Sequence, residues 1–168
     1  MNRVQLATTG LFVAWSAHDL EELLTMSDNS RVLVARLPAW LPVPASVRTR
    51  GFTRRYVRVS VAAVGVVVAA AAVRGYRTQG RSAFYQNALL GFGLHGFGHI
   101  GASVLAGSYT SGVATSPTVV IPFWLWATLA LQQEGVPDRR SAPAAVVLAG
   151  GSIAGGHLVA SLLTRNRP

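Results

Sequence analysis

A histidine and several carboxylates interrupt the first apolar segment of this sequence, where hydrocarbon side chains would be expected. The stretch 15-WSAHDLEELL-24 places His18 ahead of Asp19, Glu21 and Glu22. A helix turns about 100° per residue, so Glu21 and Glu22 can face the same direction as His18. Asp19 is turned about 100° away from His18 and need not join them. Imidazole and carboxylate together are typical ligands of zinc or iron.

The other three histidines also lie in apolar segments. His95 and His99 are four residues apart in the third such segment, and His157 lies in the last one. A charged side chain near the centre of a bilayer costs at least ~2.5–3.5 kcal/mol on insertion scales, so such groups usually face the bundle interior and have partners there. We therefore expect one buried metal site, with its ligands drawn from His18, Glu21, Glu22, His95, His99 and His157.

Further roles follow from this arrangement. One of Glu21 and Glu22 would be a ligand, and the other would be a catalytic general acid or base. Asn87 lies two turns before His95 on nearly the same face, so it could orient a ligand by hydrogen bonding, although it could equally begin its helix. Tyr109 is a second candidate for such an orienting partner.

Other interpretations of these residues stay open. A single buried histidine is more often a hydrogen-bonded core residue than a ligand, and the four could belong to a metal-free Glu–His network. The polar run 25-TMSDNS-30 predicts the end of the first helix. Asp19 and one of the two glutamates could therefore lie at a solvated helix end.

The composition indicates a membrane protein. The chain has 168 residues, of which 51% are hydrophobic and 12% charged, whereas soluble domains average about 25% charged residues. This length fits one membrane-embedded domain, residues 1–168. The absence of cysteine excludes disulfides and thiolate ligands. The net charge of +9 reflects arginines between the apolar segments, which we expect to face anionic lipid and not nucleic acid, for which the chain has no motif.

Five apolar segments predict an all-α, polytopic transmembrane bundle, because in lipid a helix satisfies its backbone groups within one segment. The segments cover about residues 4–26, 56–73, 82–106, 117–131 and 142–163. The second and fourth are shorter than the ~20 residues that usually span a bilayer. Gly151 and Gly155 have the spacing that lets helix backbones approach closely, and we expect the third and fifth segments to be neighbours.

The connection 27–55 is the longest, and it contains 38-PAWLPVP-44 and six arginines. The positive-inside rule predicts that it is cytoplasmic, in what we expect to be a bacterial cytoplasmic membrane. The N-terminus would then lie outside and 165-RNRP-168 inside. Three arginines of the next connection would lie outside and oppose this orientation, namely Arg74, Arg77 and Arg81.

Four elements, in order, resemble those of a known family. The first, 18-HDLEE-22, fits an H-x-x-E-E motif, and 95-HGFGH-99 fits N-x-x-x-H with His95 in place of Asn. Next, 109-YTSGVAT-115 fits a Y-x-P-G turn followed by Thr, with Ser in place of Pro, and 119-VVIPFW-124 fits an apolar helix containing Pro. Together they resemble the HXXEE family of small integral membrane proteins, over about residues 5–130.

The resemblance implies a membrane location and an active or metal site at the His and Glu residues, without a general substrate. Two departures from the pattern have consequences. His95 in place of Asn adds a potential ligand, and Ser111 in place of Pro is expected to loosen the turn.

We therefore expect a metal-dependent integral membrane enzyme that acts on a hydrophobic or lipid-like substrate arriving from the bilayer. Hydrolysis, with a water activated by the metal, and oxidation by a non-haem metal are equally open. One alternative is a metal-free acid–base enzyme, such as an isomerase or cyclase. Another is a non-enzymatic membrane protein, such as a proton path or an assembly subunit.

Overall fold

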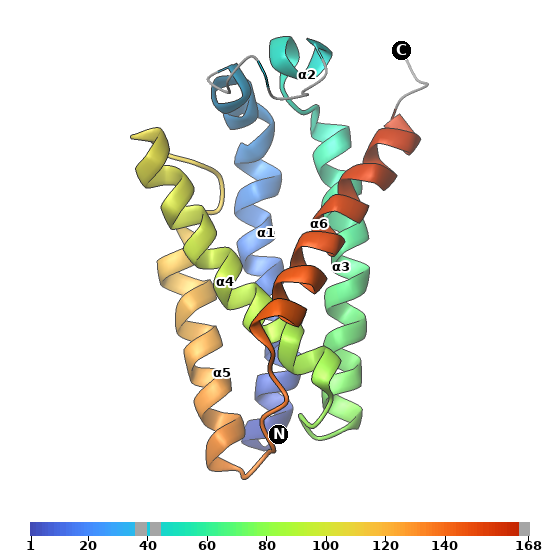
Figure 1. Ribbon diagram of the computed structural model, residues 1–168, viewed down its shortest axis with the longest axis vertical. Coiled ribbons are helices and arrows are strands. Elements are labelled where there is room, and N and C mark those ends of the chain that lie inside the picture. The colour runs from blue at the N-terminus through green and yellow to red at the C-terminus, as the bar shows by residue number, and fades with distance from the viewer. Residues whose placement is uncertain (36–39, 41–44, 165–168) are drawn as a thin grey trace.

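The computed structural model describes residues 1–35, 40 and 45–164, and these form a bundle of long helices that run alternately up and down (Figure 1). No strand occurs among these residues, so the prediction of an all-α fold is confirmed. The elements in chain order are α1 (Arg3–Ala35), α2 (Ala45–Arg50), α3 (Arg54–Arg77), α4 (Ala83–Ala106), the π-helical turn η1 (Ser116–Val120), α5 (Ile121–Gln133) and α6 (Ala142–Thr164). Below, the α2 end is the upper end in Figure 1, and the opposite end is called the N-terminal end.

The predicted end of the first helix at residues 25–30 is wrong, because α1 continues to Ala35. The polar side chains of this run are satisfied without ending the helix. Ser27 donates its hydroxyl to the carbonyl of Phe52 at 2.9 Å, and the amide of Phe52 donates to the hydroxyl of Ser30 at 2.8 Å. The backbone of Phe52 thus provides the hydrogen-bond partners that water would provide for these serines at a helix end. The stretch 38–44 with its prolines lies outside the described residues except for Trp40, which is exposed. The stretch 165–168 lies outside them as well.

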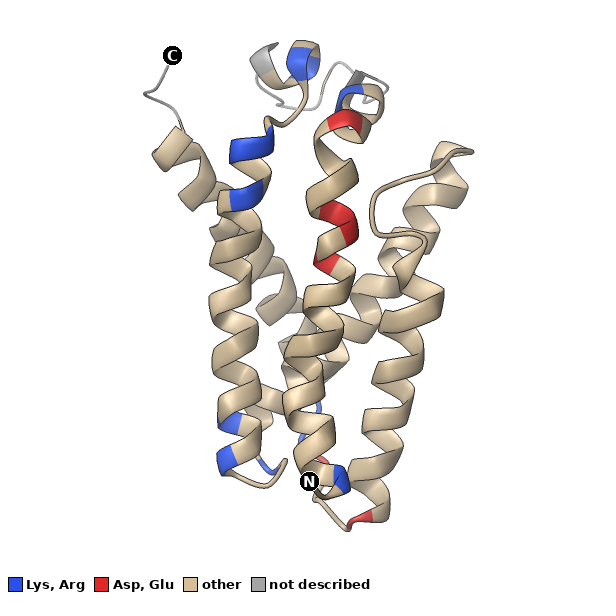
Figure 2. Cartoon of the chain, turned by 180° about the vertical axis from the view of Figure 1, so that it is seen from behind, with Lys and Arg blue, Asp and Glu red and all other residues tan. Residues whose placement is uncertain are grey.

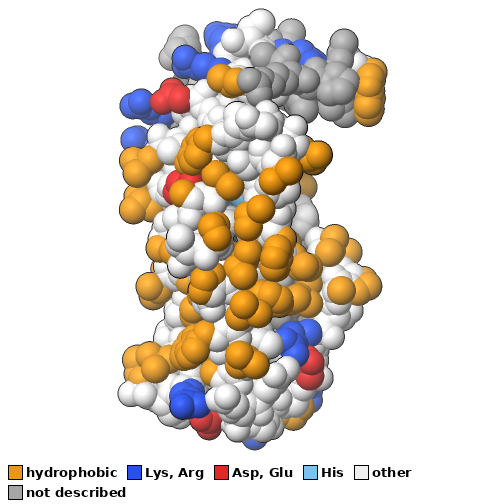
Figure 3. All heavy atoms as spheres, turned by 90° about the vertical axis from the view of Figure 1, so that its left-hand side faces the viewer, with side chains coloured by type: hydrophobic (Ala, Val, Ile, Leu, Met, Phe, Trp, Pro, Cys, Tyr) orange, Lys and Arg blue, Asp and Glu red, His pale blue; other side chains and the backbone are white. Residues whose placement is uncertain are grey.

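Among the described residues, three helices are long and apolar enough to cross a membrane, namely α3, α4 and α6, so the predicted count of five spans is approximate. Figure 2 shows that charged residues gather at both ends of the bundle, with one acidic stretch in between on α1. Hydrophobic side chains form a broad band between the charged ends on the face shown in Figure 3. This distribution of polarity is that of a protein compatible with a membrane.

Close helix contacts are made at glycines, as predicted, but not at the predicted pair. A Cβ atom on Gly91 of α4 would lie 3.2 Å from the carbonyl oxygen of Ala145 in α6. A Cβ atom on Gly156 of α6 would lie 2.9 Å from the carbonyl oxygen of Ser60 in α3. Gly151 and Gly155 have no heavy atom within 4 Å of that position, so the predicted close approach there is wrong. The tilt of α6 determines which helix faces meet, and the spacing of residues in the sequence does not predict that tilt.

These contacts give the bundle a forked shape. Helix α6 approaches α4 near Gly91 and α3 near Gly156, and above the first contact α4 and α6 diverge toward the α2 end (Figure 1). Tyr85 fixes the base of the fork, because it is fully buried against Gly75 and donates its hydroxyl to the carbonyl of Ala7 at 2.9 Å. The fork therefore stands on a rigid core, with α1 and α3 behind it.

The contact between α6 and α3 yields a stability prediction. Gly156→Ala should lower the free energy of unfolding by about 1–3 kcal/mol, because the added methyl group meets the Ser60 backbone, which cannot rotate away. Thermal unfolding of the detergent-solubilised protein, followed by circular dichroism, measures the effect. Gly151→Ala is the matched control on the same helix, and its open surroundings should leave the stability unchanged or slightly raised. Equal effects of the two changes would contradict this contact.

Candidate metal centre

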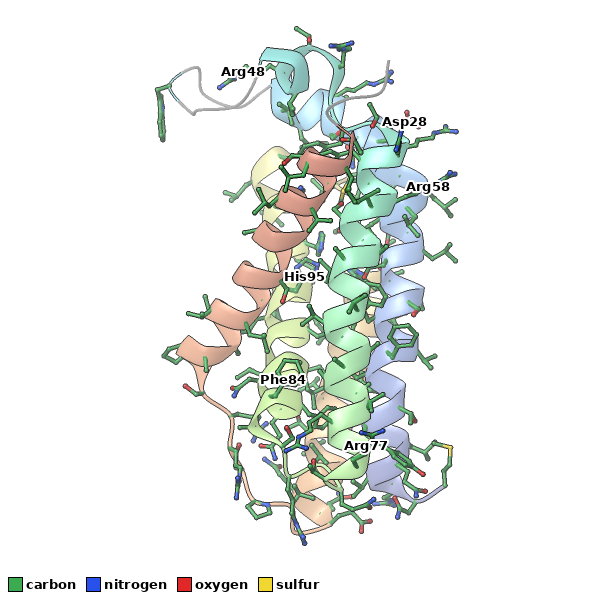
Figure 4. All side chains as sticks on the ribbon, turned by 90° about the vertical axis from the view of Figure 1, so that its right-hand side faces the viewer. Asp28, Arg48, Arg58, Arg77, Phe84 and His95 are labelled. Atoms are coloured by element: carbon green, nitrogen blue, oxygen red, sulfur yellow. The ribbon has the colours of Figure 1, made fainter. Side chains whose placement is uncertain are left out.

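Four of the six predicted ligands come together in the bundle interior. His18 and Glu22 from α1 and His95 and His99 from α4 each offer a ligand atom, and these atoms all lie within 4.8 Å of one another. Each helix contributes a pair at i and i+4, the spacing that places two side chains on one helix face. Figure 4 shows His95 between the charged ends, with Arg58 and Arg77 lying toward opposite ends of the bundle.

The distances within the group are those of ligands that share a centre or a hydrogen bond. Nε2 of His99 lies 3.3 Å from Oε1 of Glu22 and 2.8 Å from Nε2 of His95. Ligands held at 2.0–2.2 Å around a tetrahedral zinc ion are roughly 3.3 Å apart. The first distance matches this value. The second is shorter and corresponds to a direct hydrogen bond between the two imidazoles.

His18 is the best-defined member of the group. Its Nδ1 lies 2.8 Å from the hydroxyl of Thr115, and that hydroxyl lies 2.6 Å from Oε2 of Glu21. If the Thr115 hydroxyl donates to the Glu21 carboxylate, it accepts from Nδ1–H of His18, which leaves a lone pair on Nε2. That Nε2 atom is buried, and it has no hydrogen-bond partner among the described residues. A buried lone pair without a partner, aimed into a group of other donors, fits a metal ligand.

Glu21 organises the surrounding loop and does not join the group. Its carboxylate accepts hydrogen bonds from the hydroxyl of Tyr109, from the amide of Ala114 at 3.2 Å and from the amide of Thr115 at 2.8 Å, in addition to the Thr115 hydroxyl. This carboxylate is fully engaged with the loop 109–115. Of the two predicted glutamates, Glu22 thus belongs to the four-residue group, and Glu21 is hydrogen-bonded to the loop.

Gly112 brings the same loop against both helices. Its φ angle is +85°, in the left-handed region that favours glycine. A Cβ atom here would lie 2.7 Å from Nδ1 of His99 and 2.8 Å from Cε1 of His18. The His99 ring also hydrogen-bonds the backbone of Ser111. One loop therefore holds the rings of two histidines of the group that come from different helices.

The structure separates the remaining candidate residues. Tyr109 donates its hydroxyl to the Glu21 carboxylate and has no contact with the four-residue group among the interactions of the described residues. Asn87 instead accepts from the amide of Ser141 at 2.8 Å and donates to the carbonyl of Ala83, so it fixes the start of α6. His157 lies apart from the four-residue group, with Nδ1 3.0 Å from the hydroxyl of Tyr56.

Sequence reasoning missed Asp19. This residue is only 6% exposed, and it lines the same pocket as Glu22, His95 and His99. Because Asp19 is turned about 100° from His18 on the helix, we did not expect it to join the site. The pocket, however, extends around α1 toward α3, so the helix face that carries Asp19 also borders it. Thr115 was present in the family pattern as the Thr after the turn, and only the fold reveals its contact with His18.

A cavity of about 270 Å³ adjoins the group between α1, α3, α4 and α6, where α4 and α6 diverge. Most of its walls are Val, Ala, Leu, Ile and aromatic side chains. Two buried carboxylates, Asp19 and Glu22, face it, and no arginine occurs among the described residues that line it. Their negative charge has no fixed positive partner there, which is a costly arrangement unless a cation or protons provide compensation.

A helical bundle with three membrane-compatible helices and an interior His/Glu group belongs to the class of small polytopic membrane proteins with a buried polar site. The chain belongs to the HXXEE family, because the family model described as "Protein of unknown function with HXXEE motif" matches residues 9–127. This match confirms the resemblance seen in the sequence. No curated protein and no solved structure matches the chain.

The link from Glu21 through Thr115 to His18 can be tested by removing one hydroxyl. Thr115→Val keeps the shape but removes the hydrogen bonds to Glu21 and His18, and it should lower the free energy of unfolding by about 1–3 kcal/mol because buried groups lose their partner. Thr115→Ser retains the hydroxyl and should remain close to the parent protein. Thermal unfolding in mild detergent compares the variants, and a Ser variant as unstable as the Val variant would show that the methyl group matters, not the hydroxyl.

Proposed function

We propose that this protein is a metal-dependent integral membrane enzyme that acts on a hydrophobic or lipid-like substrate. The observation that carries the proposal is the buried Nε2 of His18, which has no partner among the described residues and faces the ligand atoms of Glu22, His95 and His99. In an apolar interior such an atom is costly unless it is bound. Zinc and iron are the candidates, since imidazole and carboxylate suit both.

The charge of the site supports a divalent cation. Asp19 and Glu22 supply two carboxylates, and the neutral imidazoles of the three histidines add no charge. A doubly positive ion would neutralise both acids within the pocket, so it would stabilise the folded chain as well as complete the site. A metal here would act as a Lewis acid toward an oxygen of the substrate.

Residue roles follow from position. His18, Glu22, His95 and His99 would hold the metal, and Glu21, Thr115 and Tyr109 would orient His18. Asp19 borders the pocket without belonging to the ligand group, so it is the carboxylate best situated to accept or donate a proton. The apolar walls of the pocket exclude water from this exchange and favour a hydrophobic substrate. Both hydrolysis and oxidation fit these roles.

The protein would lie in a bacterial cytoplasmic membrane with its α2 end on the cytoplasmic side. The support is the arginine content of the connection 27–55, because cytoplasmic connections are enriched in basic residues. Substrate would then enter from the bilayer at the level of the fork between α4 and α6.

A second candidate is a metal-free acid–base enzyme, such as an isomerase or cyclase. The distance of 2.8 Å between Nε2 of His95 and Nε2 of His99 favours it, because this is a hydrogen bond between imidazoles and is shorter than the separation of two zinc ligands. In that case Glu22, 3.3 Å from His99, would exchange protons with the histidine pair.

Metal content tests the first proposal. Chelator-treated protein loaded with Zn²⁺ or Fe²⁺ and analysed by mass spectrometry should retain about one ion per chain. His18→Ala and His99→Ala should bind it roughly 100-fold more weakly or lose it. His157→Ala is the matched control, because this histidine lies outside the group, and it should retain the ion. A folded parent protein that retains no metal, or a His99→Ala variant that retains all of it, refutes the proposal.

Glu22→Gln separates the two candidates by the effect of metal on stability. In a metal enzyme, saturating metal raises the thermal stability of the parent protein, by ~2.7 kcal/mol at a hundred times the Kd, and Glu22→Gln removes most of this rise. In a metal-free network, metal and chelator leave both proteins unchanged. Glu134→Gln, at an exposed carboxylate beyond α5, controls for the loss of a negative charge.

A further inference from the structure

We propose that the pocket beside the metal centre binds the single hydrocarbon tail of an amphiphilic substrate and selects that tail by length, with the head group at the metal centre. This inference rests on the proposed function and names its class of substrate. The evidence is the order in which polar and apolar side chains line the pocket, together with its size and the close helix contacts at its lower end.

Polarity changes along the pocket. Helices α1, α4 and α6 run toward the α2 end, and α3 runs away from it (Figure 1). On each of these helices, the lining residue closest to the N-terminal end is apolar, and the polar lining residues lie closer to the α2 end. Toward the α2 end the lining includes Glu22, Ser60, His99 and His157, and toward the N-terminal end it includes Trp15, Val67, Val68, Ala88 and Leu148. A molecule that fills the pocket therefore needs a polar part beside the metal centre and an apolar part below it.

The length of the apolar part follows from helix geometry. Between His95 and Ala88 the α4 helix rises about 10 Å, at 1.5 Å per residue. An extended alkyl chain advances roughly 1.3 Å per carbon given its C–C bond length, so about eight carbons fit below the metal centre. The α6 wall, from Ser152 to Leu148, covers much of the same stretch.

The volume of the pocket favours one tail over two. At about 270 Å³ it lies just below the range of small-molecule pockets, which measure roughly 300–1,000 Å³. The helices also meet closely at the lower end. The Trp15 ring would be 2.7 Å from a Cβ atom on Gly65, and the Ala149 side chain would be 3.2 Å from one on Gly91, so α1 contacts α3 and α4 contacts α6 there. A two-tailed phospholipid would have to leave one tail outside.

Photo-crosslinking measures the tail length. Protein reconstituted in phosphatidylcholine nanodiscs, loaded with Zn²⁺, is labelled with a nonanoic acid analogue, which has eight carbons beyond its carboxyl group and carries a diazirine at the end of its chain. Unlabelled straight-chain carboxylic acids of increasing length then compete. We expect the label on peptides that contain Val67, Val68 or Leu148, and competition that rises with chain length to an optimum and then falls.

A narrowed pocket should shift this optimum. Ala149→Leu fills the lower end, so the longest competing acids should lose roughly 10-fold in competition for each methylene that no longer fits, and the optimum moves to shorter acids. Ala88→Leu makes the same change from α4. Ala154→Leu, at an exposed position of α6 away from the pocket, is the matched control and should leave the optimum in place.

The outcomes distinguish this inference from the proposed function. Label spread over the outer faces of α4 and α6, with no optimum and no effect of Ala149→Leu, is binding of bulk lipid only and overturns the inference while metal binding stands. An optimum in a parent protein that retains no metal supports the tail pocket but counts against a metal-dependent enzyme. An optimum that shifts equally in Ala149→Leu and Ala154→Leu also overturns the inference.

Discussion

The structure depends on the hydrogen-bonded link from Glu21 through Thr115 to His18. In an apolar bundle each buried polar group must find a partner, because desolvation is not compensated by water. The Glu21 carboxylate accepts hydrogen bonds from the backbone and the hydroxyl of Thr115 in the loop 109–115. The same hydroxyl contacts Nδ1 of His18, so the ring is held with Nε2 in the interior. The link joins two segments that are far apart in the chain, so the His/Glu group and the packing of α1 against the loop form together.

The two glutamates of the motif have separate tasks because consecutive residues on a helix point about 100° apart. Glu21 is turned to the loop, and Glu22 is turned to the histidines of α4. His18 lies between these directions, so one of its nitrogens can face the loop and the other the interior. The spacing of the motif is thus explained by one helix that borders a loop on one side and a cavity on the other. Asp19 extends the cavity side toward α3.

Sequence patterns predicted the helices because these depend on local periodicity. They predicted the convergence of α1 with α4 because polar side chains buried in apolar segments need partners. Long apolar runs determine the helices, and the i, i+4 spacing determines which side chains share a face. The separation of His157 from the group was not predictable, since it depends on the tilt of α6, which turns this histidine to Tyr56. The same tilt makes Gly156 the contact with α3 in place of Gly151 and Gly155. The continuation of α1 depended on Phe52, a partner more than twenty residues away.

That continuation also explains how the turn is held without the proline of the family pattern. Ser111 occupies the position of Pro, and a looser turn was expected there. Asn29, which lies in the part of α1 beyond the predicted helix end, donates to the carbonyl of Tyr109 at 3.2 Å and approaches the hydroxyl of Ser111 at 3.4 Å. A hydroxyl can take part in this contact, whereas a proline ring cannot. The extended α1 helix therefore restrains the turn through Asn29, where a proline would restrain it through its own ring. Gly112 remains against the rings of His18 and His99.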